Sequence, residues 1–144
     1  MRLFGKLEKL DIGLLGNRGI KLQGCLATIS WLNGRRLKQV DLCGLESVSD
    51  ADIYALMSTS GPRLQSLQVA SSVSNSSENF NSNIFDKARN LSELDVSFSC
   101  GLVDCHRISS VFERLANLRS LKLDHLQINN SHIYELLWRL KMLM

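Results

Sequence analysis

One short phrase recurs five times along the chain, with apolar residues at its first, fourth and sixth positions. Its clearest copy is Leu-Ser-Glu-Leu-Asp-Val at residues 91–96. Copies that begin at residues 37, 64, 91 and 118 are 27 residues apart, and another begins at residue 7, 30 residues before the second. One unit of this length cannot bury its apolar side chains alone, whereas stacked units share a continuous core. The phrase therefore predicts a chain built of stacked repeats.

A period in the twenties with this phrase resembles the leucine-rich repeats. The resemblance implies an α/β fold: a right-handed leucine-rich-repeat solenoid with a parallel β-sheet on its concave face and helices on its convex face. One repeat domain would span residues 1–144 as about five repeats. We expect five parallel strands, each followed by a helix on the outer face, near residues 7–12, 37–42, 64–69, 91–96 and 118–123.

The second repeat carries the clearest helix signals after its strand. Ser49 or Asp50 can cap the helix by accepting hydrogen bonds from its free N–H groups. Gly61 and Pro62 then end the helix and lead into the next strand at Leu64. We expect Ile53, Leu56 and Met57 to face the core.

The other repeats vary around this plan. Apolar residues at helical spacing within residues 22–32, 108–115 and 133–140 predict helices with one inward face. Residues 71–83 are rich in Ser and Asn, so they predict an exposed loop that leaves only residues 84–88 for a short helix. Loops of this kind often carry function, but a tolerated insertion is the simpler interpretation.

The ends of the array lack an obvious cap. The next copy of the phrase would begin at residue 145, one residue beyond Met144. Solenoid ends need polar capping elements for solubility, and the sequence suggests none at either end. We expect a fragment of a longer array, a truncated gene product, or a domain that associates end to end with itself.

Composition narrows the function classes. A net charge of +3 is too small to argue for nucleic acid, although residues 1–38 hold eight basic side chains against only Glu8 and Asp11. No apolar stretch approaches the length of a membrane span, and no secretory signal precedes the four cysteines. We therefore expect free thiols, no membrane contact, and a cytoplasmic or nuclear location.

The second and fourth repeats also resemble the cysteine-containing leucine-rich repeats of F-box and ribonuclease-inhibitor-like proteins. Gly61-Pro62 stands at the expected turn, Leu45 replaces the signature cysteine, and Cys100 lies one position late. The resemblance implies a protein-interaction scaffold that selects substrates for a ubiquitin ligase. The alternative is a ligand-sensing or immune-receptor-type repeat region of a larger protein. The remaining matching residues are Leu37, Val40, Leu42, Val48, Asp50, Ile53 and Leu56.

Catalytic and metal-binding patterns are weak. Cys105 and His106 are sequence neighbours, so their side chains diverge and do not form a nucleophile–base pair. The spacing of Cys100, Cys105, His125 and His132 matches no usual zinc pattern. The carboxylates are scattered through the repeats without a distinct acid–base pair. We expect no enzyme activity, no cofactor and no metal.

Side chains between the leucines of each phrase should form a binding surface, because residues along a strand alternate between its two faces. We expect a protein partner on this concave side. Phe98 follows the fourth strand and is added to the surface. The candidate partner-binding residues are Lys9, Asp11, Gln39, Asp41, Ser66, Gln68, Glu93, Asp95, Phe98, Ser120, Lys122 and Asp124.

The fifth position of the phrase is mostly acidic. Asp11, Asp41, Gln68, Asp95 and Lys122 occupy it in successive strands, so several carboxylates should lie in one column. Like charges on neighbouring strands repel, which is unfavourable unless something neutralises them. One hypothesis is that the column receives Lys or Arg residues of a partner. The other is that Asp at this position suits the geometry of the repeat.

Overall fold

The computed structural model describes residues 7–13, 28–29, 31, 36–45, 48–70, 82–98, 114–124, 130–131, 133–134 and 137–138. Two of the described elements are short 3-10 helices, named η. In chain order the elements are β1 (Lys9–Asp11), β2 (Gln39–Asp41), α2 (Asp50–Ser60), η2 (Gly61–Arg63), β3 (Ser66–Gln68), η3 (Ser82–Lys87), β4 (Glu93–Asp95) and β5 (Ser120–Lys122).

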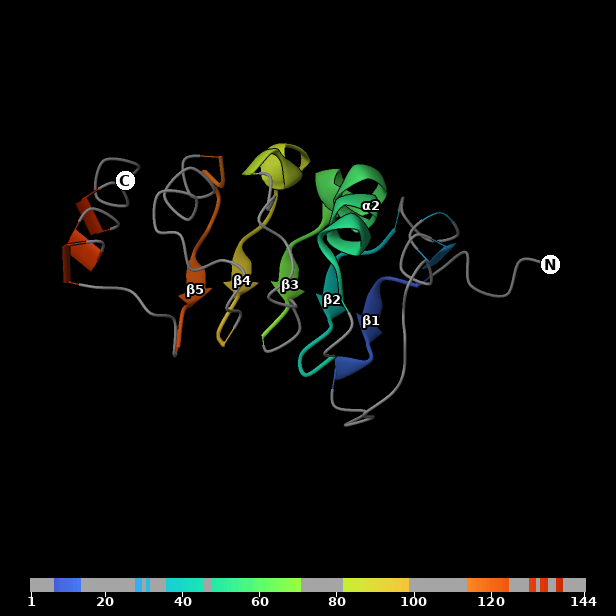
Figure 1. Ribbon diagram of the computed structural model, residues 1–144. Helices are drawn as coiled ribbons and strands as arrows, with labels where there is room; N and C mark the ends of the chain where they lie inside the picture. Colours follow the sequence, from blue (N-terminus) through green and yellow to red (C-terminus); the bar gives the residue numbers. More distant parts are fainter. Residues whose placement is uncertain are drawn as a thin grey trace.

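The five strands form one parallel sheet in the order β1-β2-β3-β4-β5 (Figure 1). Each strand covers the middle three residues of a predicted strand, and equal positions of the phrase pair across every boundary. Val40 of β2, for example, pairs with Leu10 on one side and with Leu67 on the other. The predicted strands, their parallel pairing and the α/β class are confirmed. The right-handed sense of the connections stays a prediction.

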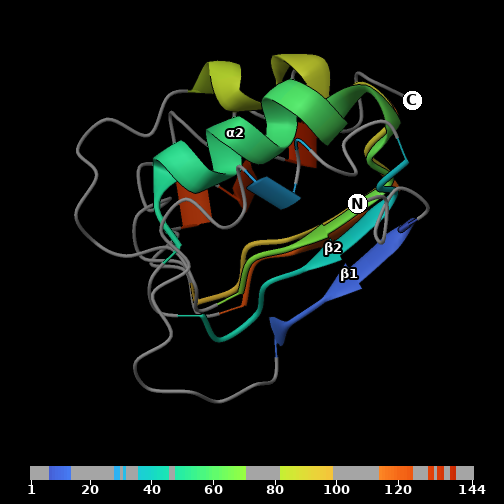
Figure 2. The same cartoon turned by 90° about the vertical axis from the view of Figure 1, so that its right-hand side faces the viewer.

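Apolar side chains of the phrase build the core between the sheet and the helical layer. The first, fourth and sixth positions of the second to fourth phrases are 0% to 3% exposed. The helical layer adds Ile53, Leu56, Met57 and Phe85, each 2% exposed or less. Figure 2 shows α2 and η3 on the same side of the sheet, which leaves the other side of the strands open. The buried strand residues are Leu37, Val40, Leu42, Leu64, Leu67, Val69, Leu91, Leu94 and Val96.

Ser49, and not Asp50, is the N-cap of α2. The Ser49 hydroxyl accepts the Asp52 N–H at 3.3 Å, and the Asp52 carboxylate accepts the Ser49 N–H at 3.1 Å. This reciprocal pair satisfies free N–H groups at the start of the helix. Pro62 lies inside η2, directly after α2, as the sequence predicts.

The third and fifth repeats depart from the predicted helices. In the third repeat the expected short helix is the 3-10 helix η3, which still buries Phe85, and Ala88 directly after it is buried as well. In the fifth, residues 130–138 are helical where described, but Ile133 and Leu137 are 42% and 56% exposed. The expected inward face is wrong for these two residues, because the described residues do not cover their side chains.

Several predictions fall outside the described residues. They are the loop at residues 71–81, the helix at residues 108–113, most of the helix at residues 22–32, and the side chains of Cys25, Cys100 and Cys105. Within the described part, no helix is long and apolar enough to cross a membrane.

Candidate functional site

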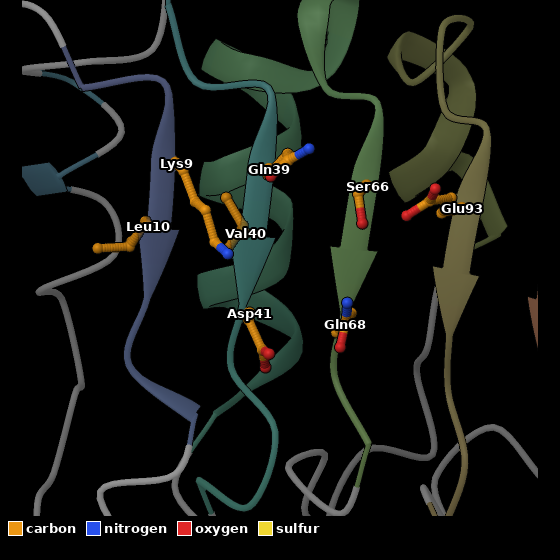
Figure 3. A pocket seen from close by; sticks show the side chains of 8 residues that line it. All are labelled: Lys9, Leu10, Gln39, Val40, Asp41, Ser66, Gln68 and Glu93. Carbon is orange, nitrogen blue, oxygen red and sulfur yellow. The ribbon is translucent and has the colours of Figure 1, made fainter.

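The third and fifth positions of the phrase lie on the side of the sheet opposite α2, which we call the open face. Side chains along a strand alternate, so the core leucine at the fourth position places its neighbours on this side. Figure 3 shows six of these side chains over β1 to β4, with α2 behind the strands. The open face consists of Lys9, Asp11, Gln39, Asp41, Ser66, Gln68, Glu93, Asp95, Ser120 and Lys122.

Exposure varies across the open face. Ser66 at its centre is only 6% exposed, because this short side chain lies between the longer Gln39 and Glu93 of the neighbouring strands. The expectation that Ser66 contacts a partner is therefore corrected, because its side chain is covered. The remaining nine side chains are half-buried or exposed. Of the two candidates outside the strands, Asp124 is exposed in the turn after β5, and Phe98 lies in the turn after β4.

The acidic fifth position has a local structural function. Asp41 Oδ1 accepts the N–H of Cys43 at 2.9 Å, and Asp95 Oδ1 accepts the N–H of Ser97 at 3.0 Å. Each bond closes the turn that follows the strand, a common use of Asp side chains. Gly13 fits beside the first of these turns, where a Cβ would lie 2.6 Å from Asp41 Oδ1. These contacts favour the hypothesis that Asp suits the repeat.

Lysines reduce the repulsion within the acidic column. Lys122 Nζ lies 3.6 Å from Asp95 Oδ2 on the neighbouring strand, and Lys9 Nζ lies 4.0 Å from Asp11 Oδ2 on its own strand. The exposed pair of Lys9 with Asp11 stabilises the fold by at most about 1 kcal/mol, whereas the Asp95 side chain in the other pair is only 13% exposed. They nevertheless give the open face mixed charge rather than a bare ladder of carboxylates.

The open face is shallow. A hollow of about 90 Å³ lies over β1 to β4, and Figure 3 shows its lining. A second hollow of about 50 Å³ continues over β5 and shares Gln68 and Glu93 with the first. Pockets for small molecules usually enclose about 300–1,000 Å³. The strip therefore suits contact with another macromolecule better than enclosure of a small ligand.

Gly44 and Phe98 adopt a left-handed backbone two residues after the sixth position of their phrases. Gly44 has a φ of 78° and Phe98 a φ of 57°, and their N–H groups bond equivalent carbonyls, those of Ala70 and Asp124, at 2.8 Å. Glycine adopts this conformation without strain, whereas any other L-residue is disfavoured by about 1–2 kcal/mol. Phe98 is nevertheless 47% exposed at the rim of the open face. An exposed aromatic side chain held at an unfavourable φ is a candidate contact residue.

Cys43 is the free cysteine within the described residues, and it is chemically quiet. Burial, followed by its hydrogen bond with Asp41, raises the pKa of the Cys43 thiol to about 12. The thiol is therefore protonated and weakly nucleophilic at neutral pH. The described residues contain no cluster of three or more metal-ligating side chains, and the pattern of Cys100, Cys105, His125 and His132 lies outside them.

Comparison with solved structures identifies the fold. The C-terminal domain of tropomodulin from Caenorhabditis elegans superposes with a TM-score of 0.65 at 12% identity, over 96% of this chain and 85% of that domain. Leiomodin-1 actin-binding site 2 (ABS2) superposes with a TM-score of 0.64 at 14% identity, over 94% of this chain and 81% of that structure. Both likenesses support a leucine-rich-repeat-like α/β fold. No protein-family model and no curated protein sequence matches the chain.

The expected subfamily is corrected by these comparisons. The resemblance to F-box and ribonuclease-inhibitor-like repeats is wrong, because the structures that share the fold are tropomodulin and leiomodin domains. Most of the residues that carried the resemblance, such as Leu37, Val40 and Leu56, lie fully inside the core. They report the packing of a stacked repeat and do not distinguish subfamilies. The discriminating position is the buried Leu45, which is not a cysteine.

Proposed function

We propose that this chain is a non-catalytic protein-binding domain that receives its partner on the open face. The observation that carries the proposal is the flat strip of polar side chains that all five strands present on the side opposite α2. Its hollows, at about 90 and 50 Å³, are small for a metabolite. They also give little support to a function in sensing small ligands.

Actin is the partner we propose, because the leiomodin-1 structure with this fold is an actin-binding site. A function of this kind places the protein in the cytoplasm or nucleus. We further propose that the connections are right-handed. We also propose that the open face is the concave side of the solenoid, because the helical layer lies on the opposite side of the sheet (Figure 2).

The chemistry of the open face suits a protein surface with charges of both signs. Glu93 is exposed near its centre, Lys9 and Lys122 are exposed on its outer strands, and Asp95 is partly covered. Such charges act mainly on the rate of association and its salt dependence. Five strands about 4.8 Å apart give a strip about 24 Å wide, which is part of a standard interface of about 800 Å² per partner. Phe98 at the rim adds an aromatic anchor of the type that dominates binding energy.

The test is co-sedimentation with actin filaments, together with binding of monomeric actin measured by fluorescence anisotropy. Glu93→Arg places a large cation at the centre of the open face, and Tyr54→Arg places the same side chain on the exposed side of α2. Tyr54 is 57% exposed, so the control perturbs the core as little as the test variant does.

We expect the wild-type chain and Tyr54→Arg to bind with equal affinity, and Glu93→Arg to bind at least about tenfold more weakly. Absence of binding to both filaments and monomers would contradict actin as the partner. Binding that Tyr54→Arg abolishes and Glu93→Arg leaves intact would contradict the open face as the surface.

A further inference from the structure

The same pair of backbone hydrogen bonds links the strands at all four boundaries of the sheet. At the second position, each N–H donates to the equivalent carbonyl of the preceding strand, as Arg119 does to Ser92 at 2.8 Å. At the sixth position, each N–H donates to the fifth-position carbonyl of the following strand, as Val96 does to Lys122 at 3.1 Å. The pair therefore follows from the phrase itself and is not specific to any one repeat.

Both outer edges of the sheet carry the unused halves of this pattern. At the β1 edge the second-position donor is Glu8 and the fifth-position acceptor is Asp11. At the β5 edge the second-position acceptor is Arg119 and the sixth-position donor is Leu123. Among the described residues, none of these four backbone groups makes the hydrogen bond that its equivalents make between neighbouring strands. A parallel strand with the same phrase at each edge would satisfy all four.

The core is unfinished at the same two edges. Leu10 of β1 and Leu121 of β5 are only partly buried, whereas the equivalent Val40, Leu67 and Leu94 are 0% to 3% exposed. The first and sixth positions of both outer phrases repeat this contrast. The partly buried end residues are Leu7, Leu10 and Ile12 on one side, and Leu118, Leu121 and Leu123 on the other.

The helical layer at the β5 end also exposes apolar side chains. Tyr134 and Trp138 are 73% and 65% exposed, and they stand with Ile133 and Leu137 at spacings that share one side of a helix. In α2 the corresponding apolar side is buried against its neighbours. Another layer of repeats beside this helix would cover these side chains.

The charged side chains at the two edges indicate which strand can pair with each edge. Two ion pairs join equal positions of neighbouring strands: Lys38 with Glu8 at 2.9 Å at the second position, and Lys122 with Asp95 at 3.6 Å at the fifth. The β5 edge presents exposed Arg119 and Lys122 at these two positions, and the β1 edge presents exposed Glu8 and Asp11. The two edges of one chain are therefore complementary in charge, position by position.

We propose that the chain associates head to tail with further copies of itself, so that β5 of one copy is extended by β1 of the next in the register of the sheet. Arg119 and Lys122 then face Glu8 and Asp11 of the second copy, and the six apolar end residues, five leucines and one isoleucine, close a continuous core. Adding a strand to an open edge is an established mode of protein recognition. Because the interface joins two different edges, each copy keeps an edge for the next copy, which produces open chains or closed rings.

A symmetric dimer is the competing arrangement. Two copies joined through their β5 edges, or through their β1 edges, would pair in antiparallel fashion, and such an interface stops at two copies. A β5 pair would not involve Glu8 and Asp11, and a β1 pair would not involve Arg119 and Lys122.

Charge reversal separates these arrangements. The first variant combines Arg119→Glu with Lys122→Glu, which makes both edges negative. The second combines Glu8→Arg with Asp11→Lys, which makes both edges positive. All four side chains are exposed, and circular dichroism and the urea midpoint check that each variant folds. Mass is measured by sedimentation velocity at low and high salt over a range of concentrations.

We expect the wild-type chain to form species larger than dimers as concentration rises, and less so at high salt, since ions screen exposed charges. Each variant alone should require about tenfold or more higher concentration to associate, and an equimolar mixture of the two should restore association. A wild-type chain that stays monomeric, either variant dimerising as readily as the wild-type chain, or a mixture that does not associate would each overturn the proposal.

Discussion

Phe98 shows how a single backbone angle connects the repeat to its surface. Two described residues, Gly44 and Phe98, have a positive φ at the same place after their strands, which glycine adopts without strain and phenylalanine at a cost. Gly44 has open space around its Cα, with its nearest contact to a Cβ at 3.5 Å, so any cost of a side chain there is conformational. Phe98 therefore combines an unfavourable conformation with an exposed aromatic ring.

The conformational cost at Phe98 can be measured by comparing two truncations. Phe98→Gly and Phe98→Ala remove the same ring, but only alanine retains the penalty at positive φ. We expect the glycine variant to have a free energy of unfolding about 1 kcal/mol higher than the alanine variant, the reverse of the usual order in strands and helices. Urea unfolding gives the difference, and Gly44→Ala should lose a similar amount. An alanine variant at least as stable as the glycine variant would refute a strained Phe98.

Cys43 gives a prediction on pH. Folding raises its thiol pKa from 9.0 to about 12, mainly through burial and then through the bond with Asp41. Because folding favours the neutral thiol, this contribution to stability is complete below about pH 9 and is lost as the pH rises toward 12. We expect iodoacetamide to modify the Cys43 peptide at pH 8.5 many times faster in urea than in the native protein. Mass spectrometry measures the rate of modification in both conditions. Equal rates in urea and in the native protein would mean that folding does not protect the thiol.

At the scale of the element, α2 depends on its N-terminal cap. The Ser49 hydroxyl and the Asp52 carboxylate satisfy each other's backbone N–H groups. Ser49→Ala should lower the free energy of unfolding by about 1 kcal/mol. Thr59→Ala is the control, because it removes a hydroxyl near the end of the same helix. The Thr59 hydroxyl donates to the carbonyls of Ala55 and Leu56 within the helix. Its loss should lower the free energy of unfolding by less than about 0.5 kcal/mol. Equal losses in thermal unfolding would exclude a specific cap.

The elements differ in how well the sequence predicts them. The strands follow from it because apolar residues at fixed offsets are what a stacked core demands, and the middle of every predicted strand is confirmed. Helices are less determined, because the third repeat has too few apolar residues after its strand, and a 3-10 helix buries Phe85 as well as an α-helix would. The exposure of Ile133 and Leu137 depends on what lies beyond them, which no local pattern encodes.

The candidate site was predicted in position more than in detail. Alternation along the strands predicts a shared face for ten residues, and they lie on the strands opposite α2, but it cannot report that Ser66 is covered by its neighbours. That these residues bind a partner stays a prediction. The turn-closing bonds of Asp41 and Asp95 had a sequence signal, since Asp often accepts the N–H two residues later. Phe98 occupies the same place in the fourth repeat as Gly44 in the second, and glycine often marks a left-handed backbone. This equivalence predicts the conformation of Phe98 only once the geometry of the turn is known.

At the scale of the whole molecule, burial should grade stability along the stack. Leu94 occupies the middle of the core at 3% exposed, whereas Leu121 holds the same position in the outermost strand and is only partly buried. Leu94→Ala should therefore cost about 2–5 kcal/mol, and Leu121→Ala clearly less. Urea midpoints at low protein concentration, where head-to-tail contacts do not form, compare the two directly. A loss at Leu121 equal to or greater than that at Leu94 would be inconsistent with this packing.

We propose that the open face binds a protein and that actin is this protein. A photoreactive side chain placed singly at Gln39, Gln68 or Tyr54 tests both parts, because it reports which surface lies against the partner. Gln39 and Gln68 belong to the open face, and Tyr54 is exposed on α2. After irradiation with actin, we predict covalent adducts from positions 39 and 68 and none from position 54. Adducts from position 54 alone, or no adducts from any position, would contradict the binding of actin to the open face.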